Sequence, residues 1–149
     1  MSAPVAVASA RAGVPTRGMF ISWIKTQTRN RDTDQFGHVN HAAIATLFEE
    51  GRIALVFTPE LVAETATVDL LVASLSMTFH KELRAPGSVE IGSIVTRIGT
   101  SSFCVDQAVF TEATCFASAA AVCVLLGKES RKPAPVSDLM RAGLLAGAK

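Results

Sequence analysis

Residues 31–41 read Arg31-Asp32-Thr33-Asp34-Gln35-Phe36-Gly37-His38-Val39-Asn40-His41. This stretch places two aspartates, two histidines and a glycine directly before a mostly apolar run over 42–57. The apolar positions of the run follow at steps of three and four residues, which predicts a helix. These positions are Ile44, Leu47, Phe48, Gly51 and Leu55. Because the other sides of this helix are also largely apolar, it is expected to be buried on most of its circumference.

Two residues mark the ends of the predicted helix. Asn40 is expected to be the N-cap, with its side-chain oxygen accepting a backbone N–H of the first turn. Pro59 is expected to end the helix, because proline cannot continue it. Between the two aspartates and the helix, Gly37 allows a backbone conformation that other residues resist.

The remaining ordered segments have the composition of strands. They span 19–29, 71–80, 89–98, 103–111 and 116–126. In 71–80 apolar and polar residues alternate, which predicts a half-buried strand with one apolar face, formed by Leu71, Ala73, Leu75, Met77 and Phe79. One helix followed by four successive strands indicates an α+β domain with the helix packed on a five-stranded antiparallel sheet. A single helix leaves sheet edges uncovered, so we expect a homo-oligomer.

Length and composition restrict the class of protein. The chain has 149 residues, 49% of them hydrophobic and 18% charged, and a net charge of +1. These values predict one folded domain over 19–136, with a flexible tail over 1–18 and a tail or short helix over 137–149. The small net charge provides no broad field for a nucleic acid or a membrane surface. Three cysteines without a CxxC spacing favour reduced thiols and a cytoplasmic location.

The stretch from Asp32 to Asn40, with Glu49 and Arg52 downstream, resembles the signature of the 4-hydroxybenzoyl-CoA thioesterase family, acyl-CoA thioesterases of the hotdog fold. The resemblance continues through Phe79-His80-Lys81-Glu82-Leu83-Arg84 and through 97–103, and it covers about residues 20 to 136. It implies a long central helix wrapped by a five-stranded antiparallel sheet. It also implies a homodimer or homotetramer with sites between subunits.

The resemblance implies roles for three titratable residues. Asp34 is in the position of the carboxylate that acts as nucleophile or general base, and the sequence does not separate these two roles. The backbone amides near Asn40 and His41 would polarise the thioester carbonyl, because a helix N-terminus offers unpaired N–H groups. His41 stands at the spacing of a supporting histidine found in one branch. Glu49 is a second candidate base, because other hotdog thioesterases use a glutamate on the helix.

Further residues are candidates for substrate contacts, and for each a purely structural role stays open. Candidates for the oxyanion site or the acyl and pantetheine channel are Gly37, His38, Val39, Asn40, His80, Ser101 and Ser102. Candidates for the phosphates of coenzyme A are Arg84, Lys128, Arg131 and Lys132. The chain departs from the family pattern in having no tyrosine, with Ile44 at the position where a tyrosine often stands.

The sequence therefore predicts an acyl-CoA thioesterase that needs no metal or redox cofactor, since His38 and His41 have no further ligands at matching spacing. Two alternatives stay open. One is a hotdog dehydratase or hydratase, and the other is a protein that binds acyl-CoA without hydrolysing it. The acyl specificity and the choice between coenzyme A and carrier-protein thioesters are not encoded in any motif that we identify.

Overall fold

The structure, a computed structural model, describes residues 13–147. Five antiparallel strands form one sheet in the order β1-β3-β4-β5-β2. The strands are β1 (Ser22–Thr28), β2 (Val68–Phe79), β3 (Gly87–Ile98), β4 (Ser102–Thr111) and β5 (Thr114–Gly127). The helices are α1 (His41–Val56), α2 (Val62–Thr65) and α3 (Asp138–Ala146). The predicted antiparallel sheet is confirmed, although β1 begins at Ser22 because Arg17–Met19 forms a 3-10 turn.

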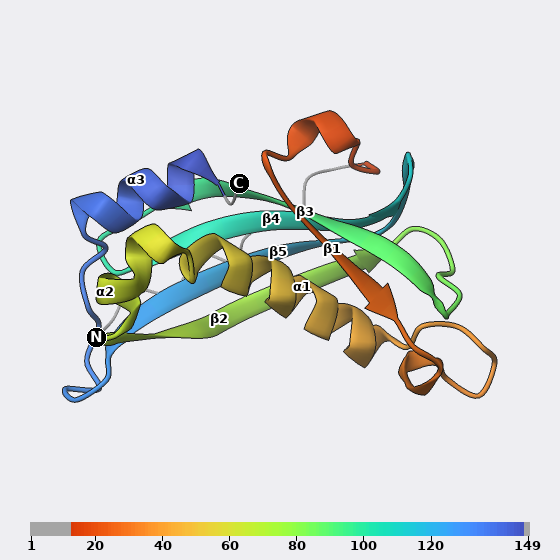
Figure 1. Ribbon diagram of the computed structural model, residues 1–149, viewed down its shortest axis with the longest axis horizontal. Coiled ribbons are helices and arrows are strands. Elements are labelled where there is room, and N and C mark those ends of the chain that lie inside the picture. The colour runs from red at the N-terminus through yellow and green to blue at the C-terminus, as the bar shows by residue number, and fades with distance from the viewer. Residues whose placement is uncertain (1–12, 148–149) are drawn as a thin grey trace.

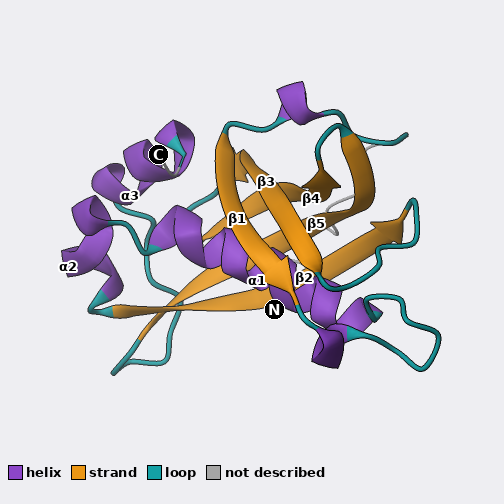
Figure 2. Ribbon diagram, turned by 45° about the vertical axis from the view of Figure 1, so that its right-hand side comes forward, coloured by secondary structure: helices purple, strands orange, loops and turns teal. Residues whose placement is uncertain are grey.

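The sheet curves around α1, which lies between β1 on one side and β2 on the other (Figure 1). When the molecule is turned, β1 and β3 are seen to pass across the helix (Figure 2). The short α2 and α3 lie together near the C-terminal end of α1. The opposite end of α1, where the helix begins, carries the loop over 29–40.

Helix α1 begins as the sequence predicts, because Oδ1 of Asn40 accepts the N–H of Ala43 at 2.8 Å. The helix has 16 residues, about four and a half turns, and so is shorter than the long helix that was expected. The expectation that it is buried on most sides is also wrong for this chain. One side is exposed along its whole length, at His41, Ala42, Thr46, Glu49, Glu50 and Ile53. The sheet contacts only the opposite side.

Gly51 lets α1 approach the sheet closely. A Cβ atom at this position would lie 2.6 Å from Nε2 of Gln107 and 2.8 Å from Cγ2 of Ile91. Phe48, one turn earlier on the same side, is fully buried. The core between α1 and the sheet therefore depends on the absence of a side chain at one helical position.

The face predicted for β2 is partly wrong, because the strand contains a β-bulge at residue 73. Before the bulge, Leu70 pairs with Leu125 and Val72 with Cys123; after it, Leu75 pairs with Ala121. These three partners share one face of β5, so Leu70, Val72 and Leu75 lie on the helix side. Leu71 consequently faces away from Leu75, although a strict alternation places them together.

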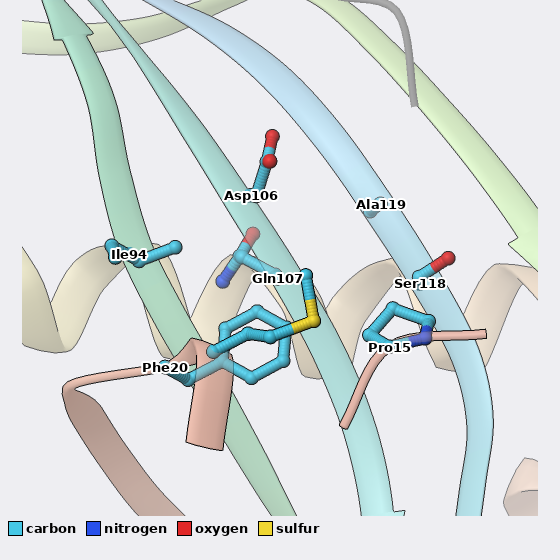
Figure 3. Close-up of a pocket in the computed structure, with 8 residues that line it drawn as sticks. Pro15, Phe20, Ile94, Asp106, Gln107, Ser118 and Ala119 are labelled. Carbon is cyan, nitrogen blue, oxygen red and sulfur yellow. The ribbon is translucent and has the colours of Figure 1, made fainter. Parts of the chain in front are cut away.

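The face of the sheet away from α1 is covered in part by the segment before β1. Phe20 is buried there against Phe110, and the guanidinium of Arg17 lies 4.1 Å from the ring centroid of Trp23. Figure 3 shows Pro15 and Phe20 beside β3, β4 and β5, with α1 behind the strands. Of the predicted flexible tail over 1–18, residues 1–12 lie outside the described part of the chain.

Candidate active site

The loop before α1 is a tight turn centred on Asp34. The N–H of Asp34 donates to the carbonyl of His38, and the N–H of Gly37 donates to the carbonyl of Asp34. Gly37 has a φ of 81°, a left-handed conformation that glycine adopts without strain. The carboxylate oxygen Oδ1 of Asp34 accepts the N–H groups of Phe36 (2.8 Å) and His38 (3.1 Å). The other carboxylate oxygen, Oδ2, lies 4.0 Å from Nδ1 of His38.

The surroundings of Asp34 keep it ionised. Partial desolvation raises its pKa, but the backbone N–H groups of His38, Phe36 and Gly37 and the charge of His38 lower it by more. The pKa of Asp34 therefore lies below its usual value of 3.8. At neutral pH the loop thus presents an ionised carboxylate whose Oδ1 is held by two backbone N–H groups.

This pKa shift predicts a pH-dependent effect of Asp34→Asn on stability. Because the folded-state pKa is lowered, the ionised carboxylate stabilises the fold above pH 3.8, and the effect is lost as the pH falls through the folded-state pKa. Asp34→Asn is expected to lower the melting temperature at neutral pH and to have less effect in acid. Thermal melts of both proteins at several pH values measure this, and a difference that grows towards acid would contradict it.

A second segment holds the loop from the side. The N–H of Val39 donates to the carbonyl of Leu83 at 2.7 Å, and His38 forms an antiparallel bridge with Arg84. Leu83 is buried in the same apolar cluster as Val39. The segment also brings Oε2 of Glu82 to 3.2 Å from Nε2 of His38. The position of His38 is therefore set by two stretches of chain about forty residues apart.

A cleft of about 400 Å³ opens between this loop, the first turn of α1 and the end of β2. Its lining includes a polar set and an apolar set. The polar residues are Asp34, His38, Asn40, His41, His80, Lys81 and Glu82, and the apolar ones are Val39, Ile44, Phe79 and Leu83. The rings of His41 and Phe79 meet edge to face, with centroids 6.5 Å apart.

The first turn of α1 supplies hydrogen-bond donors to this cleft. Asn40 satisfies the N–H of Ala43, whereas the N–H groups of His41 and Ala42 have no intrahelical acceptor because they belong to the first turn. The helix N-terminus also carries a partial positive charge. The carboxylate of Asp34 and His41, the first residue of α1, therefore line the same cleft.

Six of the predicted residues line the cleft, and two others, Gly37 and Arg84, lie beside it. Asp34, His38, Val39, Asn40, His41 and His80 line it. Gly37 is in the same loop, and a Cβ atom there would lie 3.8 Å from Nη1 of Arg84. His80 also bonds away from the cleft, since its Nε2 lies 2.9 Å from Oγ of Ser118 on β5.

The other predicted residues lie elsewhere in this chain. Glu49 is exposed on α1, about 12 Å along the helix from His41. Ser102 pairs with Val124, and Ser101 precedes it in the β3–β4 turn, so both lie at the other end of the sheet. Lys128, Arg131 and Lys132 follow β5, about 36 Å along β2 from Phe79. Two of these cations already have partners: Lys128 donates to the carbonyl of Thr65, and Arg131 pairs with Asp69.

The sequence reasoning missed four residues of the cleft: Phe79, Lys81, Glu82 and Leu83. All four belong to the stretch 79–84 that contributes to the family resemblance. That stretch was a usable signal, but strand periodicity alone does not show that a segment after β2 returns to the loop before α1.

Other kinds of site find less support in the described residues. No group of three His, Cys, Asp or Glu side chains within residues 13–147 is arranged to hold a metal ion. Burial raises the pKa of Cys115 and of Cys123 to about 11, so both remain thiols at neutral pH and are poor nucleophiles. The cavity in Figure 3 measures about 20 Å³, roughly the room of one water. None of the described helices is long and apolar enough to cross a membrane.

The chain is similar to several proteins of known structure. The PA5185 protein of Pseudomonas aeruginosa is 26% identical over 89% of this chain and 94% of its own, with a TM-score of 0.81. A Thermus thermophilus thioesterase, in complex with coenzyme A and Zn, is 24% identical over 84% and 92%, with a TM-score of 0.69. The 1,4-dihydroxy-2-naphthoyl-CoA thioesterase of Synechocystis is 17% identical over 83% and 94%, with a TM-score of 0.70. The similarity to the last two structures, at less than 25% identity, establishes a shared fold and nothing more.

Family membership is shown by the sequence itself. No curated protein matches the chain. The Thioesterase superfamily, however, matches residues 36–114, more than half of the chain and a range that includes α1 with the end of the loop before it. The chain therefore belongs to the thioesterase superfamily.

Proposed function

We propose that the protein is an acyl-CoA thioesterase, which hydrolyses an acyl thioester to a free acid and coenzyme A. Asp34 acts as nucleophile or general base, and the first N–H groups of α1 stabilise the oxyanion that forms on the thioester carbonyl. Membership of the superfamily supports thioester hydrolysis. A relation to the 4-hydroxybenzoyl-CoA branch is part of this proposal and rests on the Asp34–Asn40 motif.

One observation carries the proposal. An ionised Asp34 and the first turn of α1 line the same cleft. Thioester hydrolysis needs an electron-rich oxygen at the acyl carbon and donors at the carbonyl oxygen, and the presence of Asp34 and the start of α1 in one cleft supports these two roles. Apolar side chains of Ile44 and Phe79 provide a wall suited to an acyl group.

A homodimer is part of the proposal, supported by the exposed apolar side chains of β2. This strand ends the sheet, and Leu71, Val72, Leu75 and Phe79 are 37–50% exposed. Antiparallel pairing of β2 with β2 of a second copy would cover them. It would also bring Lys128 of one copy towards the cleft of the other, because the start of one strand then lies beside the end of its partner. The choice between dimer and tetramer stays open, as does the predicted cytoplasmic location.

The test is free-thiol release from a panel of short, medium, long and aromatic acyl-CoAs. The proposal expects turnover of at least one class, with coenzyme A and free acid formed in equal amounts. Absence of thiol release from every member, combined with measurable binding of the same acyl-CoAs, would contradict hydrolysis and favour a protein that only binds acyl thioesters. Release of an unsaturated or hydrated acyl-CoA without free thiol would favour a dehydratase or hydratase.

A further inference from the structure

The imidazole of His38 lies between two carboxylates. Its Nε2 is 3.2 Å from Oε2 of Glu82, and its Nδ1 is 4.0 Å from Oδ2 of Asp34, so the ring lies nearer to Glu82. Nη2 of Arg84 lies 3.9 Å from the same Oε2 of Glu82. The remaining titratable side chains of the cleft wall are those of His80, Lys81 and, at the helix start, His41. His38 is thus oriented by Glu82 on one side and faces Asp34 on the other.

This arrangement assigns the hydrogen of the ring. An ionised carboxylate only accepts hydrogen bonds, so the nearer carboxylate, that of Glu82, favours the tautomer of His38 with its hydrogen on Nε2. In the neutral ring, Nδ1 then carries a lone pair, which is directed towards Oδ2 of Asp34. A water molecule about 2.8 Å from each of these two atoms fits across the 4.0 Å gap, on the side where both residues line the cleft.

We propose that His38 is the base that activates the hydrolytic water, and that Glu82 is a positioning residue that holds the His38 ring with Nδ1 towards that water. This inference rests on the proposed thioesterase function and deepens it. Glu82 corresponds to the aspartate of a catalytic triad, which fixes the tautomer and stabilises the imidazolium without becoming protonated.

The proposed reaction has two steps, with Asp34 as the nucleophile of the first. Oδ2 of Asp34 attacks the thioester carbon, the C–S bond breaks, and coenzyme A leaves as the thiolate. Water then attacks the same carbon of the mixed anhydride, Nδ1 of His38 takes one of its protons, and the bond from carbon to Oδ2 breaks. The free acid leaves, Asp34 is a carboxylate again, and the proton on His38 passes to the thiolate. Thioester and water give acid and thiol, with no further reactant.

The geometry explains why the base is held from outside the loop. The bridge between His38 and Arg84 and the bond from Val39 to Leu83 fix Glu82 beside the ring. Glu82 is itself 67% exposed, so its influence on His38 is screened by solvent and should be moderate. Removal of His38 should therefore cost much more activity than removal of the Glu82 charge.

The first experiment tests His38 as the base. His38→Ala is expected to lower kcat about 100-fold, the usual range for a lost general base. Rapid mixing should show a burst of about one coenzyme A per site, because acylation still occurs while hydrolysis of the anhydride is slow. The acyl mass should appear on the intact protein after a rapid quench in acid, which slows hydrolysis of the mixed anhydride. Added imidazole should restore part of the rate. Absence of both the acylated protein and the rescue would overturn the proposal.

The second experiment tests whether Glu82 acts through His38. Glu82→Gln is expected to lower kcat about fivefold with KM nearly unchanged, and to have no further effect when His38 is already alanine. Glu112→Gln is the matched control, since this glutamate is exposed in the β4–β5 turn, and it should behave as wild type. An equal loss from Glu82→Gln in both backgrounds, or no loss in either, would refute the positioning role.

Failure of this inference is distinguishable from failure of the proposed function. If the wild type releases no thiol from any acyl-CoA, the thioesterase function itself is wrong. A different result is that the wild type hydrolyses an acyl-CoA that Asp34→Asn does not hydrolyse, while His38→Ala and Glu82→Gln keep full activity. In that case only the assignment of His38 as the base and of Glu82 as its positioning residue is wrong.

Discussion

Replacing Asp34 with asparagine is expected to lower kcat/KM for a hydrolysed acyl-CoA by at least about 100-fold, the scale of a lost nucleophile or general base. Asparagine is nearly the same size, and its oxygen can still accept the N–H groups of Phe36 and His38 that shape the loop. The substitution therefore removes the charge and nucleophilicity of Oδ2 and leaves the turn in place. Initial rates of thiol release, with circular dichroism to confirm folding, measure the effect.

Asp32→Asn is the matched control for this substitution. Asp32 lies two residues away and uses its carboxylate within the loop, where Oδ2 accepts the N–H of Arg29 at 2.6 Å. We expect Asp32→Asn to keep activity within a few fold of wild type. If Asp34→Asn also keeps its activity, the chemistry does not depend on Asp34, and Glu49 becomes the next carboxylate to substitute.

The largest expected effect on stability comes from Gln107→Leu. Arg52 is only 4% exposed, and its Nη1 donates to Oε1 of Gln107 at 3.0 Å. The amide of Gln107 also donates to the carbonyl of Phe48 at 2.9 Å and to Oγ of Ser93 at 3.0 Å. Leucine leaves a buried guanidinium and a buried carbonyl without these partners, so the free energy of unfolding should fall by about 3 kcal/mol. Urea denaturation gives this difference directly.

The hydrogen bonds among Arg52, Gln107, Phe48 and Ser93 already leave one buried donor unsatisfied, so the loss of a further bond should be costly. Within the described residues, Nε of Arg52 has no hydrogen-bond partner, and burial lowers the pKa of this guanidinium against the opposing influence of Cys123 and Glu49. Gln27→Leu is the control, because Gln27 is exposed on β1 and should change stability by about 0.5 kcal/mol or less. Equal effects of the two leucine substitutions would show that the buried network contributes little.

The burial and the hydrogen-bond partner of Arg52 could not be predicted from the sequence pattern. Glu49 and Arg52 are three residues apart, a spacing at which two side chains of a helix can pair on its surface. The structure places Arg52 in the core, bonded to a residue of β4, and leaves Glu49 exposed. The apolar periodicity of a helix shows which residues share one side of it. The partner of a buried charge such as Arg52 lies on a strand elsewhere in the chain, and the periodicity carries no information about it.

The loop motif was the most predictable part of the site. Gly37 with a left-handed φ, Asn40 as N-cap and the helix beginning at His41 all follow from local chemistry within a few residues. Local hydrogen bonds and backbone preferences decide such features, so neighbouring residues suffice to predict them. The roles of Asp34, His41 and Glu49 in catalysis stay predictions.

The bulge in β2 shows the opposite case. One extra residue at position 73 moves Leu71 to the face opposite Leu75, and the alternating pattern of 71–80 carries no sign of it. The register is decided by pairing with β5, whose residues lie about fifty positions later.

By itself, the sequence determined the α+β class, the five strands and the start of α1, because these depend on periodicity and on contacts between near neighbours. Only the tertiary structure decided which residues share the cleft. The segment 82–84 reaches the loop at 34–39 because the chain leaves β2 at that end of the sheet, which places Glu82 beside His38. The same topology keeps Ser101, Ser102 and Lys128 at the far end of the sheet in the same chain. The register and curvature of the sheet, set by pairing between distant strands, thus decide the composition of the site.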